Sequence, residues 1–196
     1  MKMISLEKRL VNRQKKSERN IKKVCEGLQS IDVNDVHDVL EIGCGTGAVS
    51  AYLAAHYNMN VRGIDLDPDQ ILTARELHPE NGRLDFFNED ATRLTWANNS
   101  FDLVISQNVF HHIPEWQTVA DELVRVVRPR GYLMWFDLTF SRLVKKVLYP
   151  FMKDYLGLYT FEEIKSFFKS KDFSIWLHQK EAHGPFMHHH LVLRKS

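Results

Sequence analysis

The segment Val39-Leu40-Glu41-Ile42-Gly43-Cys44-Gly45-Thr46-Gly47 joins an apolar run to three alternating glycines. The run extends back to Val36 and is typical of a buried parallel strand that ends at the glycines. Glycine has no Cβ, so the backbone here can lie close to a ligand where the strand turns into a helix. The N-terminus of that helix directs free N–H groups toward the same point. The segment therefore predicts a ligand-binding turn between a strand and a helix.

Strands and helices alternate along the chain after this segment. Apolar spacing predicts strands at 36–42, 60–64, 84–88, 101–106 and 132–137, and helices at 48–57, 68–77 and 115–127. A turn, Arg128-Pro129-Arg130-Gly131, is expected before the last of these strands. Upstream, Leu6–Leu28 has the spacing of one or two amphipathic helices with a break near 12–17. The alternation predicts a parallel sheet with helices on both faces.

The C-terminal part has a different pattern. A helix-prone aromatic stretch at 140–159 and a helix at 160–169 precede two strand-like runs, 173–179 and 186–193. The turn Ala182-His183-Gly184-Pro185 between the runs is too short for a crossover helix, so we expect an antiparallel hairpin. The predicted fold class is therefore α/β: a three-layer, doubly wound sheet of seven strands, mostly parallel, with a C-terminal antiparallel hairpin.

The bulk composition indicates one globular domain over residues 1–196, of which 44% are hydrophobic and 26% charged. We expect N-terminal helices at 1–30, a ligand-binding core at 36–137, a helical cover at 138–170 and the hairpin at 171–196. The mean hydropathy of -0.33 and the absence of a signal peptide or transmembrane pattern argue against a membrane protein. Two cysteines, Cys25 and Cys44, form no disulfide framework, which favours a cytoplasmic location. A net charge of +1 gives no reason to expect a nucleic-acid partner.

An aspartate, Asp65, ends the predicted strand after the glycine turn. It lies 65 minus 43, or 22, positions after Gly43, close to the separation expected for a carboxylate that binds a ribose. Gly43, Gly45 and Ala48 also satisfy the loose G-x-G-x-x-A pattern of dinucleotide sites. These features alone leave an adenosyl cofactor and a dinucleotide both open.

A wider set of motifs comprises Glu41 before the first glycine, Asp90-Ala91 after the third strand, Phe101–Ser106 in the fourth strand, and Leu123–Leu133 before the fifth. Together these motifs resemble the class I, Rossmann-like methyltransferases that depend on S-adenosylmethionine. The resemblance extends from about Val36 to Phe136 in unbroken motif order. Within the family, Asn108–Ile113 is similar to the small-molecule subgroup that includes ubiquinone-biosynthesis enzymes.

The resemblance implies that the core at 36–137 binds S-adenosylmethionine and that S-adenosylhomocysteine is the second product. It places the methionine part at the glycine turn, the ribose at Asp65 and the adenine at Leu66, Asp90 and Ala91. The implied cofactor-binding residues are Glu41, Gly43, Cys44, Gly45, Gly47, Asp65, Leu66, Asp90, Ala91, Gln107 and Asn108. The segment 138–170 would then cover the acceptor side.

The candidates for a catalytic general base are His111 and His112, because they follow the fourth strand and imidazole titrates near neutral pH. The alternative is that both only pack, since methyl transfer can proceed by alignment of a reactive nucleophile alone. No metal site is expected: His183 and the run at 188–190 have no accompanying zinc spacing.

The aromatic side chains near the expected acceptor side favour a small apolar or aromatic acceptor. Residues 142–149 form a basic amphipathic run, for which contact with an anionic membrane surface and a solvated helix face are both open. Three other functions stay open. They are an NAD-dependent oxidoreductase, a non-catalytic S-adenosylmethionine-binding module, and an RNA methyltransferase that uses the basic positions Lys15, Lys16, Arg19, Lys22 and Lys23. The oligomeric state is not determined by the sequence.

Overall fold

A computed structural model describes residues 5–183 and 186–196. Its helices are α1 (Ser5–Leu28), α2 (Ala48–His56), α3 (Pro68–Leu77), α4 (Trp116–Val126), α5 (Arg142–Met152) and α6 (Phe161–Ser170), with short 3₁₀ turns η1 (Val33–Asp35) and η2 (Phe110–His112). Its strands are β1 (Asp38–Ile42), β2 (Asn60–Asp65), β3 (Leu84–Asn88), β4 (Phe101–Gln107), β5 (Val127–Thr139), β6 (Phe173–His183) and β7 (Phe186–Lys195). No helix in these ranges is long and apolar enough to cross a membrane.

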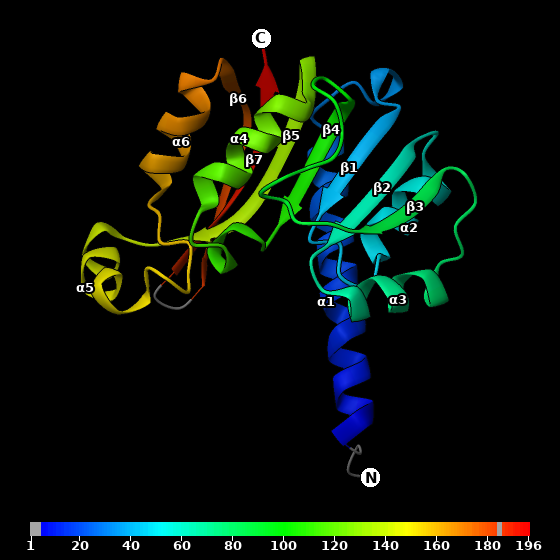
Figure 1. The fold of residues 1–196 in the computed structure, drawn as a ribbon, viewed down its shortest axis with the longest axis horizontal. Helices are drawn as coiled ribbons and strands as arrows, with labels where there is room; N and C mark the ends of the chain where they lie inside the picture. The colour runs from blue at the N-terminus through cyan, green and yellow to red at the C-terminus, as the bar shows by residue number, and fades with distance from the viewer. Residues whose placement is uncertain (1–4, 184–185) are drawn as a thin grey trace.

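The seven strands form one sheet in the order β3-β2-β1-β4-β5-β7-β6 (Figure 1). Strands β1 to β5 pair in parallel, and β7 is antiparallel to both of its neighbours, β5 and β6. The expected α/β sheet with a C-terminal hairpin is therefore confirmed. The strand order reverses between β1 and β4, and ligands of doubly wound folds bind at such a switch point.

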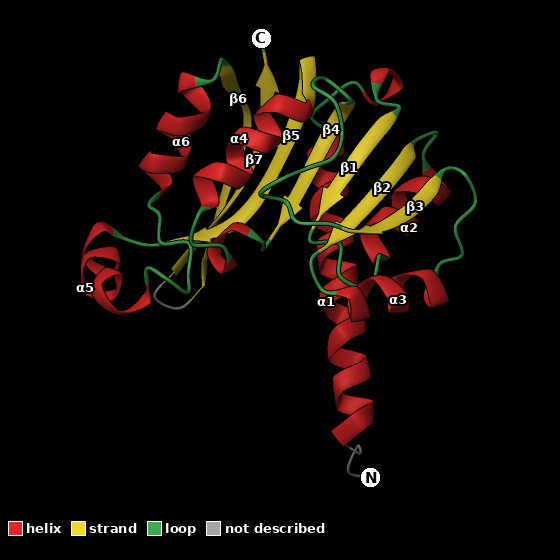
Figure 2. Ribbon diagram, viewed as in Figure 1, coloured by secondary structure: helices red, strands yellow, loops and turns green. Residues whose placement is uncertain are grey.

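Helices lie on both faces of the sheet (Figure 2). Consecutive strand residues point to opposite faces, so Leu133 and Trp135 pack toward α4 and α6 while Met134 and Phe136 pack toward α1 and α2. Each face therefore has its own apolar core. The three layers follow from this alternation, because a strand buried on both faces needs a helical layer on each side.

Of the one or two helices expected over Leu6–Leu28, the structure has one, because α1 is continuous from Ser5 to Leu28. Two other predicted elements differ from the structure. The expected turn at 128–131 is an irregularity within β5 and does not precede the strand. Val127 pairs with Phe101 and Tyr132 pairs with Leu103, so β5 advances five residues where β4 advances two. Arg130, in this irregularity, has φ +66°. The helix-prone stretch 140–159 is helical only over α5, Arg142–Met152. After α5 the chain leaves the helix, and Gly157 packs against the backbone around η2. The expected hairpin turn includes residues 184 and 185, which lie outside the described residues.

Candidate functional site

The glycine turn at the carboxyl end of β1 is held by the end of β2. Gly45 N donates to Asp65 Oδ2 at 2.8 Å, and the other oxygen of Asp65 accepts from Asp67 N at 3.0 Å. Gly43 has φ +64°, and a Cβ at this position would lie 2.4 Å from Val109 Cγ2. A Cβ at Gly45 would meet only Gln70, at 3.8 Å. Packing therefore requires glycine at position 43, while the Gly45 backbone faces open space.

Below the turn, the side chain of Glu41 is buried at the end of β1. Ser50 Oγ donates to Glu41 Oε2 at 2.5 Å. Burial raises the pKa of Glu41 to about 7, and the charge of Asp65 adds to the rise. Burial also raises the pKa of the Cys44 thiol, so Cys44 is a neutral thiol and not a nucleophile. The acidic groups Glu41 and Asp65 thus lie together beside the glycine turn, where they would stabilise a positively charged ligand.

Two cavities adjoin at the carboxyl edge of the sheet, and both are lined by Gly43, Asp65 and Asn108. The first, about 530 Å³, is mostly polar; its other walls are Lys16, Ser17, Asn20, Glu41, Cys44, Gly45, Thr46, Ala48, Val49, Gln70 and Gln107. The second, about 460 Å³, has apolar walls and acidic groups; its other walls are Ile64, Leu66, Glu89, Asp90, Ala91, Thr92, Val109, His112, Ile113, Pro114 and Glu115. Each volume is in the range of small-ligand sites.

The structure brings most of the sequence-predicted site residues to these walls. Glu41, Cys44, Gly45 and Gln107 line the first cavity, and Leu66, Asp90, Ala91 and His112 line the second. Gly47 and His111 line neither. Gly47 packs instead against Phe86, because a Cβ there would lie 2.5 Å from that ring.

Two residues at the end of β4 complete the shared wall. Asn108 has φ +57° and donates its backbone N–H to Phe136 O at 2.8 Å. Gln107 is only 7% exposed; its Nε2 donates to Asn20 O at 3.2 Å, and its Oε1 has no hydrogen-bond partner among the described residues. A buried amide oxygen without a partner costs free energy, so the first cavity offers an acceptor for a ligand N–H.

Helix α1 contributes Lys16, Ser17 and Asn20 to the first cavity, which the sequence did not predict. These residues belong to no motif, and their helical spacing indicates only a polar face. Gln70 and Ser50 were missed for the same reason. Their roles depend on how α1, α2 and α3 pack around the edge of the sheet.

The two candidate catalytic histidines have different surroundings. His111 Nδ1 lies 2.5 Å from Asp137 Oδ1, and the other oxygen of Asp137 accepts from Val109 N and Phe110 N at 3.0 and 2.8 Å. Because a carboxylate only accepts, this contact places a proton on Nδ1 and leaves Nε2 as the free nitrogen of neutral His111. The ring centroid of His112 is 3.9 Å from that of His111. Burial, and secondly His111, lower the pKa of His112, so His112 is neutral at pH 7.

The histidines of the C-terminal hairpin lie elsewhere. His178 Nε2 and His189 Nδ1 are 2.9 Å apart, and the Phe161 ring stacks on both. His190 Nε2 lies 2.8 Å from Lys23 Nζ. Among the described residues, no group of three or more histidine, cysteine or acidic side chains is arranged to hold a metal ion.

Residues 40–135 match the sequence model of the family described as the methyltransferase domain. The chain is 41% identical over 99 residues to a 2-methyl-6-phytyl-1,4-hydroquinone methyltransferase from Synechocystis sp., covering 50% of this chain and 31% of that protein. It is 37% identical over 107 residues to a phthiotriol/phenolphthiotriol dimycocerosates methyltransferase from Mycobacterium leprae, covering 54% and 39%. The matches thus span less than half the length of these curated relatives.

Solved structures extend the similarity to nearly the whole chain. A putative sarcosine dimethylglycine methyltransferase from Galdieria sulphuraria superposes with a TM-score of 0.77 at 15% identity, covering 91% of this chain and 85% of that one. A SAM-dependent methyltransferase structure from Methanosarcina mazei gives 0.68 at 20% identity, covering 85% and 95%. At such identities the likeness concerns the fold, which is the Rossmann-like methyltransferase fold.

Proposed function

Residues 40–135 belong to the methyltransferase domain family, and on this premise we propose that the protein is an S-adenosylmethionine-dependent methyltransferase acting on a small apolar acceptor. S-adenosylhomocysteine is then the second product. The observation that carries the proposal is the pair of adjoining cavities that share Asp65. Bound there, S-adenosylmethionine would supply an electrophilic methyl group on a positively charged sulfur.

The residues of the two cavities fit the parts of this cofactor. The first cavity offers the partnerless Oε1 of Gln107 to an ammonium group, and it reaches the N-terminal turn of α2, where a carboxylate is favoured. The second offers apolar walls at Leu66 and Ile113 and the acidic group of Asp90 to a purine. Asp65 lies on the wall common to both, where a ribose diol would be held. Its oxygens already accept from Gly45 and Asp67, but a carboxylate has further lone pairs.

Charge also favours this cofactor over a dinucleotide. Among the walls of the first cavity, the acidic groups Glu41 and Asp65 outnumber the single cation Lys16, and a cationic ligand would favour the ionised form of Glu41. This balance disfavours a pyrophosphate. Of the five basic positions considered for an RNA methyltransferase, Lys22 and Lys23 contact Glu26 and Glu181 at 3.8 and 3.2 Å, and Lys16 lines the first cavity. These observations support a small-molecule methyltransferase.

We assign the general-base role to His112 and a positioning role to the His111–Asp137 pair. His112 lines the second cavity from η2, whereas Leu66 and Asp90 of the proposed purine wall follow β2 and β3. An acceptor that enters from the η2 side would lose its proton to His112, which burial keeps neutral at pH 7, when its nucleophilic atom takes the methyl group. The Asp137 carboxylate fixes the backbone of Val109 and Phe110 and the ring of His111, against which His112 lies.

The nature of the acceptor is supported by the relatives. Their names include a phytyl hydroquinone, phthiotriol dimycocerosates and a fatty acid. Such acceptors are largely hydrocarbon, so their binding would exclude water around the transferring methyl group.

Calorimetric titration with S-adenosylmethionine, S-adenosylhomocysteine and NAD tests the proposal. We expect binding of both adenosyl ligands, no binding of NAD, and loss of adenosyl binding in Asp65→Ala. Asp85→Ala is the matched control, because Asp85 lies on the neighbouring strand β3 and lines neither cavity. Binding of NAD alone would replace the methyltransferase with an oxidoreductase. Tight adenosyl binding without turnover of any apolar acceptor would favour a non-catalytic module.

A further inference from the structure

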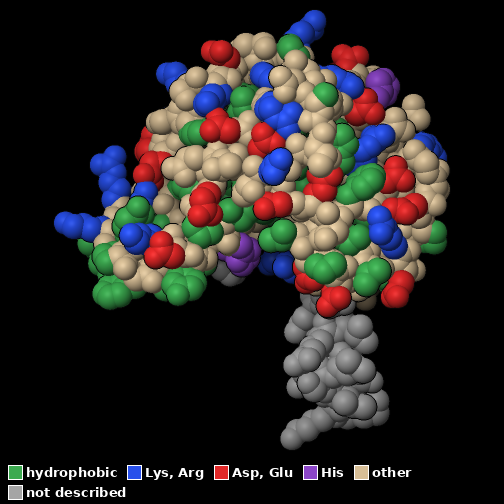
Figure 3. All heavy atoms as spheres, in the orientation of Figure 1, with side chains coloured by type: hydrophobic (Ala, Val, Ile, Leu, Met, Phe, Trp, Pro, Cys, Tyr) green, Lys and Arg blue, Asp and Glu red, His purple; other side chains and the backbone are tan. Residues whose placement is uncertain are grey.

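Helix α5 exposes an apolar stripe to solvent. Leu143, Val147 and Phe151 recur every four residues and are 72%, 59% and 76% exposed, and Tyr155, just past the helix, is 72% exposed. Residues four apart share one helix face, so the three side chains form a continuous surface. Figure 3 shows hydrophobic side chains gathered at the end of the molecule where α5 lies. Leaving four large apolar side chains in water is unfavourable, which indicates an interaction surface.

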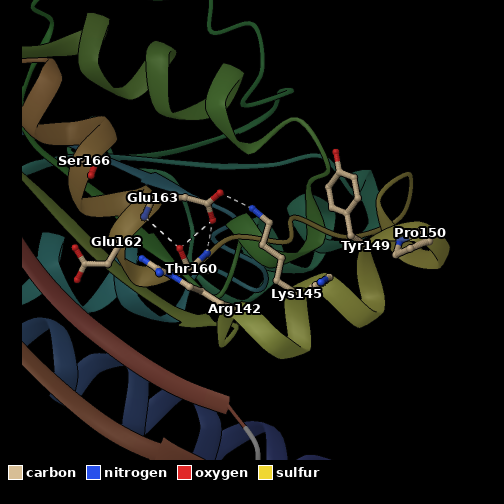
Figure 4. A pocket seen from close by; sticks show the side chains of 9 residues that line it. Arg142, Lys145, Tyr149, Pro150, Thr160, Glu162, Glu163 and Ser166 are labelled. Atoms are coloured by element: carbon tan, nitrogen blue, oxygen red, sulfur yellow. Dashed lines mark hydrogen bonds and ion pairs between the residues drawn. The ribbon is translucent and has the colours of Figure 1, made fainter.

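Cations border this apolar stripe. Arg142, Lys146 and Lys153 are exposed and make no ion pair within the described ranges. The exposed carboxylates near them are Asp154 and, across the cavity on α6, Glu162 and Glu163, of which Glu163 is paired with Lys145. Lys145 differs, because its Nζ lies 2.5 Å from Glu163 Oε1 on α6 (Figure 4). That ion pair ties α5 to α6 across a cavity of about 700 Å³. The helix is thus attached through Lys145, while Arg142 and Lys146 stay exposed at the wall of this cavity and Lys153 is exposed past the end of the helix.

The segment that carries α5 is attached to the wall of the candidate active site. Phe140 N donates to Tyr159 O at 3.0 Å and closes the base of the segment, and Gly157 N donates to His111 O at 3.2 Å. A Cβ at Gly157 would lie 2.1 Å from Phe110 O, so this contact is close. α5 therefore lies on the same edge of the sheet as the candidate base, which follows β4.

We propose that α5 binds the surface of a membrane that contains anionic lipids and so presents the active site to an acceptor dissolved in the bilayer. This inference rests on the proposed methyltransferase function. The apolar stripe would enter the boundary between headgroups and acyl chains, and Arg142, Lys146 and Lys153 would lie among the phosphates. One short helix gives a weak, reversible attachment.

Charge decides between a membrane and a second copy of this chain. In a symmetric pairing of two α5 helices, the apolar stripes would meet, but the same three unpaired cations would border both of them. Like charges at such an interface are repulsive. An anionic lipid surface complements the stripe and the cations together.

Vesicle co-sedimentation of the whole chain, without cofactor, tests the inference. Vesicles of phosphatidylcholine alone are compared with vesicles in which part is replaced by phosphatidylglycerol. We expect binding to the anionic vesicles that weakens with added salt. Phe151→Glu should weaken it by about tenfold or more, because it places a charge in the stripe. Leu77→Glu is the matched control, since Leu77 is 57% exposed on α3 and should leave binding unchanged.

A second pair of variants tests the cations. Replacing Arg142 and Lys146 with glutamine should weaken binding by about 25-fold, at about fivefold for each cation near an anionic surface. Replacing Arg93 and Lys169, exposed cations on other elements, should change binding less than twofold. A blue shift of tryptophan emission in Phe151→Trp on anionic vesicles would report insertion.

Three results would overturn the inference: no binding of the wild-type chain to anionic vesicles, equal binding by Phe151→Glu, or a wild-type dimer that Phe151→Glu dissociates without any vesicle binding. Calorimetry with S-adenosylmethionine on the same variants separates the two proposals. The surface variants should bind the cofactor as the wild type does, whatever the vesicles show.

Discussion

The Asp137 carboxylate near the end of β5 contacts the His111 ring in the segment after β4, with Oδ1 and Nδ1 2.5 Å apart. Asp137 is fully buried, and its second oxygen accepts two backbone N–H groups from the same segment. A buried carboxylate is tolerated only when hydrogen bonds replace its hydration. This one therefore fixes the backbone that supports His112.

Asp137→Asn should lower the free energy of unfolding by about 2 kcal/mol, because it removes charged hydrogen bonds from a buried site. Urea unfolding measures the change. Asp85→Asn, at a half-buried position with no side-chain hydrogen bond in the described structure, is the control and should cost little. Equal stability of Asp137→Asn and wild type would mean that this carboxylate does not hold the segment.

His112→Gln should lower kcat by about 100-fold, which is the lower end of the range expected for loss of a general base. Since burial lowers the pKa of His112 below its usual 6.5, wild-type activity should be level through pH 7 and fall only at lower pH. The variant should lose this acidic limb, which a pH profile of kcat measures. His111→Gln is the comparison: it should change the rate and keep the limb, but move it to higher pH, because His111 lowers the pKa of His112. An unchanged profile in His112→Gln would remove His112 as the base.

Glu41→Gln should stabilise the protein at alkaline pH. The folded state raises the pKa of Glu41 from 4.5 to about 7, so the folded form holds this proton more tightly than the unfolded form. The stability from this group is fully present below pH 4.5 and is lost as the pH rises through about 7. The advantage of the variant should therefore grow to about 3 kcal/mol between pH 5 and pH 8 in urea unfolding. The exposed Glu76→Gln should show no such trend.

Gly43→Ala should cost more stability than Gly82→Ala, although both glycines have positive φ, +64° and +79°. Backbone strain of about 1 to 2 kcal/mol is common to the two variants. Only at position 43 would the new Cβ lie 2.4 Å from Val109, whereas nothing lies within 4 Å at position 82. Overpacking should add about 1 to 3 kcal/mol at position 43, measured by thermal unfolding. Similar losses at both positions would show that strain alone matters there.

The sequence by itself determined the fold class and the location of the glycine turn. Strand and helix periodicity are local properties, and the short length of the apolar run Val39–Ile42 together with the glycines that end it favours a buried strand over a helix. The short turn before Phe186 likewise predicted the antiparallel hairpin. The sequence left one or two N-terminal helices open because the polar residues 12–17 break the apolar spacing, but they do not break the helix.

Only the tertiary structure decided which polar side chains meet. Asn20 and Gln107 are 87 positions apart, and Asp137 and His111 are 26 apart, yet each pair is in hydrogen-bond contact. No local pattern encodes such contacts, because they depend on the order of strands in the sheet and on the angle at which α1 crosses its edge. The exposure of the apolar side chains of α5 was undecided for the same reason: amphipathic spacing shows that a helix has an apolar face, and only packing shows whether that face is covered.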